Sequence, residues 1–435
     1  MTQPAHYLFS LWDGGGNVAP QMSVARALVD RGHTVRVLAD PVLAADVRAA
    51  GAEHVAWTTA PHRTTVAPET QLAADHDTAN PLLIFRRIVD ELTCGPAARF
   101  AADARAEIAR RRPDVVVASD ALLGVRIAAE AEGLPCASLF ANPMSFRGWG
   151  TPPLGPGFPP ARGPLGRLRD DLVGRAGDRL WSRGLRDVNA ARAAHGLAPV
   201  ATVLEQIMAV DRMLILTSPA FELPGFTPPA HVRIAGARLD DPAWAGDWTP
   251  PPGDAPLVLV ALSSTYQAQE DVLRRAVAAL AGLPVRGLVT TGPSVDPATV
   301  DAPANVIVVA RAPHSEVLRH AAACVTHGGH GTLIKALAAG VPVVVLPMGR
   351  DQLDNAARAA HHGAGVRLRP KAAPGRIAEA VRRVLADPAY AGAAGRLAGA
   401  IAAEGREDRA VAELEALRAI REAGVLPSPR RVVAA

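Results

Sequence analysis

Residues 326–332 read THGGHGT and, after a predicted helix, residues 340–347 read GVPVVVLP. An apolar strand ends at Thr326, a glycine-rich turn opens the helix, and a second apolar strand follows it. Free backbone N–H groups and the positive end of the helix dipole then face one point, which favours an anion, most often a phosphate. His327, His330 and Thr332 add donors that can hold a diphosphate and leave room for a bulky group beyond it. A nucleotide-sugar has that shape.

The overall composition favours a small-molecule ligand. The chain has 435 residues, too many for one ordinary core, which predicts two domains. Lys and Arg number 46 against 42 Asp and Glu, and the basic residues are scattered along the chain. A dedicated nucleic-acid surface would gather them on one face. We therefore expect no nucleic-acid partner.

Cysteine usage and hydropathy indicate a cytoplasmic protein. Cys94, Cys136 and Cys324 are far apart and show no paired metal-ligand spacing, so we expect reduced, buried thiols. No basic leader with an apolar stretch is visible, and no run of about 18 apolar residues occurs. We expect a soluble, cytoplasmic chain without membrane insertion.

The first half has the pattern of a parallel, doubly wound sheet, in which strands alternate with helices and a glycine turn follows the first strand. The predicted strands are 7–12, 34–38, 114–118, 136–140 and 214–217, with helices at 20–31 and 122–132. Residues 147–166 are rich in Gly and Pro and predict an irregular, mobile loop over a site. The tryptophan and phenylalanine in this loop indicate an apolar ligand.

The same alternation restarts after a Pro- and Asp-rich segment at 240–254, which we interpret as a linker. The predicted strands are 257–262, 286–291, 306–309, 324–326 and 343–346, with a helix at 270–280. The last 50 residues predict alanine-rich helices that pack back across the joint. The domains are therefore predicted as 1–239 and 255–435.

Residues 327–355, HGGHGTLIKALAAGVPVVVLPMGRDQLDN, resemble the donor-binding signature of nucleotide-sugar-dependent glycosyltransferases of the GT-B architecture. The resemblance is to the natural-product (antibiotic) branch of family GT1. Residues 312–318 are similar to the segment that borders the nucleobase, 262–265 to the first phosphate turn of the C-terminal domain, and 16–20 to the acceptor-side loop. The resemblance spans the whole chain and implies two Rossmann-like α/β domains that face a central cleft.

The resemblance places the donor site in the C-terminal domain. His327 would contact the pyrophosphate, and Asp351 and Gln352 would hold sugar hydroxyls, which a carboxylate and an amide can read together. Asp351 also fits a plain helix N-cap. The implied donor-binding set is Ser264, Thr265, Pro313, His314, His327, Gly329, His330, Gly331, Thr332, Lys335, Asp351 and Gln352.

Lys335 departs from the family pattern. Relatives that use UDP-sugars usually have glutamate there, whose carboxylate holds both ribose hydroxyls. A dTDP donor lacks the 2′-hydroxyl and loses less without that carboxylate. We therefore expect a dTDP-sugar, often a deoxysugar, in preference to a UDP-sugar. The alternative is that Lys335 lies on an exposed helix face.

Asn17 is a second departure, because many relatives have a histidine there that deprotonates the acceptor. An amide cannot act as a general base. The family partner of that histidine matches Asp120, so Asp120 could be the base while Asn17 orients the acceptor, or Asp13 in the same turn could be the base. Asp120 also fits a helix N-cap, and the acceptor could need little help.

The acceptor side is less defined by sequence. His62 and His76 lie in a polar, irregular region and could reach the acceptor or be surface histidines. Phe146 and Trp149 would contribute apolar contacts from the loop at 147–166 and its flank. The resemblance implies an inverting transferase without metal or other cofactor, whose partners are a nucleotide-sugar and an apolar small molecule. The sequence leaves open whether the chain forms a homodimer.

Two other functions fit parts of the sequence. Residues 14–19, GGGNVA, match the G-x-G-x-x-A fingerprint, with Asp40 about 20 residues on, as in NAD- or FAD-dependent oxidoreductases. This interpretation leaves the turn at 326–332 unexplained. A catalytically silent transferase-like partner protein would explain Asn17, but not the retained Asp351 and Gln352.

Overall fold

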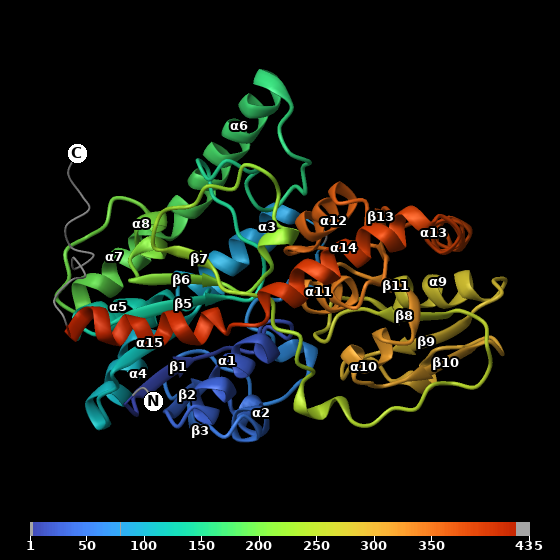
Figure 1. Cartoon of the computed structure of the whole chain (residues 1–435). Helices are drawn as coiled ribbons and strands as arrows, with labels where there is room; N and C mark the ends of the chain where they lie inside the picture. The colour runs from blue at the N-terminus through green and yellow to red at the C-terminus, as the bar shows by residue number, and fades with distance from the viewer. Residues whose placement is uncertain (1–2, 79, 423–435) are drawn as a thin grey trace.

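The computed structural model describes residues 3–78 and 80–422. It contains two parallel β-sheets with helices on both faces (Figure 1). The first has the strand order β3-β2-β1-β4-β5-β6-β7. Its strands are β1 (His6–Ser10), β2 (Thr34–Ala39), β3 (Glu53–Ala56), β4 (Val115–Ser119), β5 (Cys136–Phe140), β6 (Arg212–Ile215) and β7 (Val232–Ile234).

The second sheet has the order β10-β9-β8-β11-β12-β13. Its strands are β8 (Leu257–Ala261), β9 (Arg286–Thr290), β10 (Val306–Val309), β11 (Ala321–Thr326), β12 (Val343–Val345) and β13 (Gly365–Arg367). The predicted fold class, two doubly wound α/β units, is confirmed. Three strands were not predicted, namely β3, β7 and β13. All three are edge strands of three or four residues that are only partly buried, so they lack a long apolar run.

Helices cover each sheet in two layers. Around the first sheet lie α1 (Val18–Asp30), α2 (Ala44–Ala49), α3 (Pro81–Arg87), α4 (Ala97–Arg110), α5 (Leu123–Ala131), α6 (Gly163–Trp181), α7 (Leu185–Ala194) and α8 (Val203–Met208). The others are α9 (Glu270–Leu280), α10 (His314–Leu318), α11 (His330–Ala338), α12 (Gln352–His361), α13 (Pro374–Ala386), α14 (Pro388–Glu404) and α15 (Arg409–Glu422).

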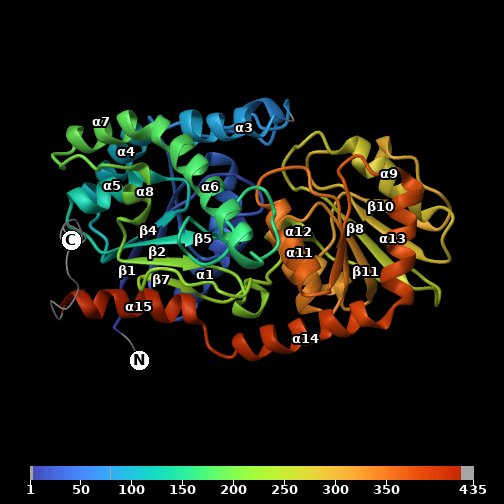
Figure 2. The same cartoon turned by 90° about the horizontal axis from the view of Figure 1, so that it is seen from above.

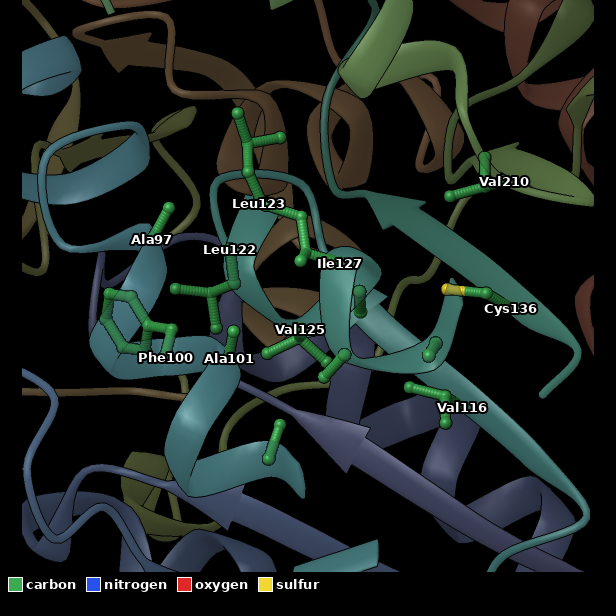
Figure 3. Packing of buried hydrophobic residues seen from close by; sticks show 14 of the residues in the cluster. Ala97, Phe100, Ala101, Val116, Leu122, Leu123, Val125, Ile127, Cys136 and Val210 are labelled. Carbon is green, nitrogen blue, oxygen red and sulfur yellow. The ribbon is translucent and has the colours of Figure 1, made fainter. Parts of the chain in front are cut away.

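Strand residues alternate between two cores in the first domain, as a period of two requires. Leu8 and Val116 face α4 and α5, whereas Tyr7 faces α1 and α15. In Figure 3, side chains of α4 and of the α5 region pack together above the sheet. These two helices approach closely at Gly124, where a Cβ would lie 2.1 Å from the carbonyl oxygen of Ala97.

The C-terminal helices return to the first domain. Figure 2 shows α14 along the second domain and α15 along the first. Buried Val411, Leu414 and Leu417 of α15 join the core beside α1. An ion pair joins Arg212 Nε to Glu413 Oε2 at 2.8 Å. The predicted linker at 240–254 lies between β7 and β8, and residues 1–2 and 423–435 of the predicted domains lie outside the described residues.

The three cysteines are buried and free, as predicted. Within residues 3–78 and 80–422, none of the helices combines the length and the apolar character that a membrane crossing needs.

Candidate active site

Both sheets reverse their strand order, and the two reversal points face each other. The reversal lies between β1 and β4 in the first sheet and between β8 and β11 in the second. Open α/β sheets bind ligands beyond the carboxyl ends of their strands at such points. A Cβ on Gly15, after β1, would lie 2.5 Å from Thr265 Cγ2 and 2.8 Å from Ser264 Oγ, after β8. The two loops therefore meet across the domain boundary.

A cavity of about 940 Å³ lies between the domains at these loops. Most of the predicted site residues line it. They are Asp13, Asn17, Asp120, Phe146, Ser264, Thr265, His314, His327, Gly329, His330, Gly331, Thr332, Lys335, Asp351 and Gln352. The structure thus brings together residues from both halves of the sequence.

Four predicted residues do not belong to the described lining of this cavity, namely Pro313, His62, His76 and Trp149. The His62 ring lies against its own loop, with Nδ1 2.8 Å from the carbonyl oxygen of Ala60. The His76 ring packs edge-on against Tyr266 in an interdomain contact. Trp149 is buried behind Phe146, with ring centroids 5.2 Å apart. The structure therefore assigns the two histidines and Trp149 packing contacts outside the cavity wall.

The turn at 326–332 has the predicted local form. Gly328 has φ +92°, and α11 begins at His330 with Gly329 as an N-cap that offers no side chain. A Cβ on Gly329 would lie 2.5 Å from His327 Nε2, so only glycine leaves room for this ring. Burial, together with Arg350, lowers the pKa of His327 to about 3. The ring is neutral and can donate one N–H.

The side chain of His330 has another role than the predicted one. Its Nε2 lies 2.9 Å from Thr217 Oγ1, in the loop after β6 of the first domain. Burial lowers its pKa to about 3. The imidazole therefore joins the two domains instead of gripping a diphosphate, although its backbone still starts α11. Sequence could not show this, because the partner is 113 residues away in the chain.

The side chains of Asp351 and Gln352 differ in how many of their polar atoms remain available for a ligand. Gln352 is 1% exposed, and its Oε1 accepts from the backbone N–H groups of Met348 and Gly349, at 2.6 Å and 3.0 Å. Its Nε2 donates to Gln267 Oε1 at 2.9 Å. Asp351 is the N-cap of α12 by position, but its side chain makes no capping hydrogen bond and accepts from Asn355 Nδ2 at 2.7 Å. Gln352 thus mainly shapes the loop, and Asp351 is the freer of the two.

Lys335 is buried, which excludes the exposed-face alternative. Its Nζ lies 2.6 Å from Asp241 Oδ1. Asp241 also accepts from the backbone N–H of Ser315 at 3.0 Å and from its hydroxyl. Burial alone would raise the pKa of Asp241, but Lys335 and Ser315 hold it below its usual value. Asp241 was missed as a site residue, because its Asp- and Pro-rich segment predicted only a linker.

His314 lies beside this pair. Its Nε2 is 2.9 Å from Thr290 Oγ1, at the end of β9. Burial and the charge of Lys335 lower its pKa to about 4, so the ring is neutral. Lys335, Asp241, His314 and Thr290 thus form a compact polar floor in the C-terminal half of the cavity.

The polar atoms of Asn17 are used within its own turn. Oδ1 accepts from the Gly14 N–H at 3.1 Å, and Nδ2 donates to the Trp12 carbonyl oxygen at 3.0 Å. Asp13 is paired with buried Arg63, with Nη1 2.6 Å from Oδ2. Both side chains therefore hold the N-terminal loop in shape.

Asp120, another predicted candidate for the general base, has its carboxylate in the cavity lining. It is half-buried, follows β4, and accepts from Ser119 Oγ at 3.1 Å. Burial raises its pKa despite the nearby charge of Arg126. Arg126 Nη2 donates to the backbone oxygen of Asp120 at 2.6 Å, not to its carboxylate. Leu122, not Asp120, is the N-cap of α5.

The N-terminal half of the cavity is apolar. The π-helical turn Ile88–Thr93 after α3 and the helix α6 supply much of this wall, which sequence did not predict. The apolar residues that line it include Met22, Leu72, Ile84, Phe85, Ile88, Leu92, Phe140, Met144, Phe146, Leu154, Leu180 and Trp181. The shape suits a hydrophobic molecule opposite the polar floor.

The loop predicted at 147–166 is irregular until α6 begins at Gly163, and residues 153–156 line the cavity. It is anchored to the second domain. Asp354 on α12 accepts from the backbone N–H groups of Gly155 at 2.7 Å and Gly157 at 3.2 Å. The loop therefore closes one side of the cavity.

Within the described ranges, no three His, Cys, Asp or Glu side chains are grouped so that they could hold a metal ion. Asp40, the acid of the dinucleotide alternative, is fully buried and accepts from the Asp13 N–H at 2.9 Å. Burial raises its pKa to about 7. It lies beneath the loop, outside the cavity lining.

Known proteins share both sequence and architecture with this chain. Residues 277–417 match the family described as erythromycin biosynthesis protein CIII-like, C-terminal domain. The 4'-demethylrebeccamycin synthase of Lentzea aerocolonigenes is 32% identical over 404 residues, which cover 90% of this chain and 94% of that protein. The chain belongs to the natural-product glycosyltransferases of family GT1.

Further comparisons agree with this membership. Oleandomycin glycosyltransferase of Streptomyces antibioticus is 29% identical over 420 residues, or 95% of this glycosyltransferase and 91% of that protein. The crystal structure of the glycotransferase of kitacinnamycin aligns with a TM-score of 0.75 and 26% identity over 96% of this chain and 100% of that one. The GT-B prediction is confirmed, and this glycosyltransferase moves a sugar onto a natural-product acceptor. The membership disfavours the oxidoreductase interpretation.

Proposed function

We propose that this glycosyltransferase transfers a deoxysugar from a dTDP-sugar donor to an apolar natural product. The transfer inverts the anomeric configuration and needs no metal ion. The observation that carries the donor assignment is the buried Lys335–Asp241 pair. In UDP-sugar enzymes of the family a glutamate at position 335 would accept from both ribose hydroxyls. An ammonium group has no acceptor, so a 2′-hydroxyl would lose its partner there.

Asp241 does not replace that glutamate. Its Oδ1 receives Lys335, and its Oδ2 receives both polar groups of Ser315. A deoxyribose places no 2′-hydroxyl on this floor, so it leaves one donor fewer without an acceptor than a ribose would. These contacts support dTDP over UDP as the nucleotide.

The two halves of the cavity suit opposite roles. The turn at 326–332 and the start of α11 would hold the diphosphate and stabilise the negative charge of the leaving group. Asp120 lies on the N-terminal half, where it would take the proton of the acceptor. Attack from the side of Asp120 on a sugar held from the opposite side inverts the anomeric centre. The apolar wall around Phe85 and Trp181 would hold the acceptor.

The proposal is tested by a transfer assay with one sugar supplied as its dTDP and its UDP derivative. Apolar polycyclic phenols and amines serve as acceptors, and products are detected by mass spectrometry. We expect kcat/KM to favour the dTDP-sugar, and excess EDTA to leave the rate unchanged. NMR should show the anomeric configuration opposite to that of the donor. A retained configuration, or loss of activity in EDTA, would contradict the corresponding part of the proposal.

Variants at position 335 test the donor assignment. A single Lys335→Glu change would face the carboxylate of Asp241, so the informative variant is Lys335→Glu with Asp241→Asn. We expect its donor preference to move about tenfold toward the UDP-sugar, since one hydrogen bond to a charged group is restored. Lys371→Glu, at the other lysine of the chain and exposed, is the matched control. A native preference for UDP would overturn the assignment.

A further inference from the structure

Arg350 lies in the loop between β12 and α12, directly before Asp351, and has a backbone of unusual conformation. Its φ is +54°, in the left-handed region that non-glycine residues seldom adopt. Such strain persists only where surrounding contacts maintain it. Arg350 was not predicted to belong to the site.

The side chain of Arg350 supplies those contacts. Nε and Nη2 form a two-pronged ion pair with Asp75, at 2.5 Å and 3.0 Å from Oδ2 and Oδ1. Asp75 belongs to the first domain, so the pair crosses the cleft. The carboxylate is 8% exposed and the arginine side chain 26%. Two of the three guanidinium nitrogens are therefore fixed on one side.

The third nitrogen points to the place where the two domains meet. Nη1 donates to Thr265 Oγ1 at 3.1 Å and, over a longer distance of 3.4 Å, to the Gly14 carbonyl oxygen. Thr265 belongs to the turn expected to hold phosphate, and the charge of Arg350 also reaches His327. Arg350, Thr265 and His327 all line the cavity. A cation is thus held beside two predicted phosphate contacts that are themselves neutral.

We propose that Arg350 binds the diphosphate of the donor through Nη1, which exchanges its long hydrogen bond to the Gly14 carbonyl oxygen for a phosphate oxygen, while Asp75 holds the guanidinium in place from the opposite domain. This inference rests on the proposed nucleotide-sugar site and adds its cation. Arginine binds phosphate oxygens by charge-assisted hydrogen bonds. As the sugar leaves, the same contact would stabilise the charge that develops on the diphosphate.

The alternative role for Arg350 is a plain interdomain tie without contact to the donor. Asp75→Asn and Arg350→Ala both break the ion pair, but only Arg350→Ala removes the positive charge from the cavity. If Arg350 is only an interdomain tie, both changes should weaken dTDP binding equally. If Arg350 contacts the diphosphate, Arg350→Ala should weaken dTDP binding strongly and Asp75→Asn only slightly.

The test is calorimetric titration of native protein and of Arg350→Ala, Arg350→Lys and Asp75→Asn with dTDP and with thymidine, which has no phosphate. We expect Arg350→Ala to weaken dTDP binding about tenfold or more, because one charge-assisted hydrogen bond is lost. Thymidine binding should not change. Arg350→Lys should keep part of the affinity, and Asp75→Asn should change it less than about threefold.

Asp77→Asn is the matched control, since it removes the same charge from the same loop, where Asp77 pairs with Arg87. It should leave dTDP affinity at the native value. Equal losses for Arg350→Ala and Asp75→Asn, or a parallel loss of thymidine binding, would overturn the inference and leave a structural tie. Native protein that binds neither dTDP nor thymidine would instead overturn the proposed function itself. Thermal midpoints verify that each variant is folded.

Discussion

At the scale of single residues, the proposed acceptor chemistry depends on Asp120. The family histidine is replaced by Asn17, whose amide is tied to its own loop, and Asp13 is tied to Arg63. Asp120 keeps a carboxylate at the cavity, and burial moves its pKa upward. A general base is most effective when its pKa approaches the working pH, so this shift suits the role.

We predict that Asp120→Asn lowers kcat by about 100-fold, as loss of a general base typically does. Affinity for dTDP should remain within about twofold, since Asp120 lies in the other half of the cavity. Asp120 must be ionised to act, so native kcat/KM should fall as the pH drops through its raised pKa. The Asn variant should lack this limb of the steady-state pH profile.

Asp13→Asn serves as the control for Asp120→Asn. It removes a carboxylate that is already neutralised by Arg63 and should keep the acid limb of the profile. Near-native turnover of Asp120→Asn together with loss of the limb in Asp13→Asn would transfer the role of base to Asp13.

Single residues also show where prediction from sequence ends. The strand, turn and helix around His327 were predictable, because glycines and helix starts are local features. The contacts of His330 with Thr217 and of Lys335 with Asp241 were not, because their partners are 113 and 94 positions away in the chain. Arg350 gives no local signal, since its ion pair is with Asp75, a carboxylate of the other domain.

At the scale of elements, the loop before α6 and the helix α12 form one unit across the cleft. Asp354 accepts from two backbone N–H groups of this loop, and Arg367 Nη1 donates to the Gly157 carbonyl oxygen at 2.8 Å. Gly157 has φ +63°, and a Cβ there would lie 2.3 Å from the Leu353 carbonyl oxygen. The sequence predicted the irregular loop but not this anchor.

We predict that Asp354→Asn raises the KM for the acceptor several-fold, because a neutral amide oxygen accepts more weakly than a carboxylate. Burial raises the pKa of Asp354 to about 6, against the charge of Arg358 and the loop N–H groups. Protonation should therefore loosen the loop as the pH falls through about 6 in the native enzyme. Steady-state kinetics with varied acceptor should show this rise in KM, and the Asn variant should lack it.

Asp271→Asn, on the outer face of α9, is the matched control for Asp354→Asn. It should keep the native KM at every pH. An unchanged KM for the acceptor in Asp354→Asn would show that the loop anchor does not shape the acceptor site. A changed dTDP affinity would show that the anchor acts on the nucleotide half of the cavity, which would contradict the prediction.

At the scale of the whole molecule, the site exists only where two similar domains meet. The carboxyl ends of β1 and β4 face those of β8 and β11. Contacts between the domains here include Gly15 against Thr265, Asp75 with Arg350 and His330 with Thr217. The parallel sheets followed from the alternation of strands and helices in the sequence. The apolar wall in the N-terminal half of the cavity could not be predicted in this way, because α3, the turn Ile88–Thr93 and α6 come together only in the folded chain.

The helix α15 couples the two domains from outside. It leaves the second domain after α14 and packs on the first, where Arg238 and Asp408 form an ion pair close to its start. This crossing is a second covalent connection between the two domains, and the linker at 240–254 contributes Asp241 to the cavity. The polar and the apolar half of the cavity thus come from different domains and still form one continuous space.

The central claim is that the C-terminal half of the cavity holds a dTDP-linked donor. The measurement that tests it most directly is a calorimetric titration of the native protein with dTDP, UDP and NAD⁺ under identical conditions. We predict that one dTDP binds per chain, that UDP binds more weakly, and that NAD⁺ does not bind. Binding of NAD⁺ alone, or of no nucleotide, would contradict the claim.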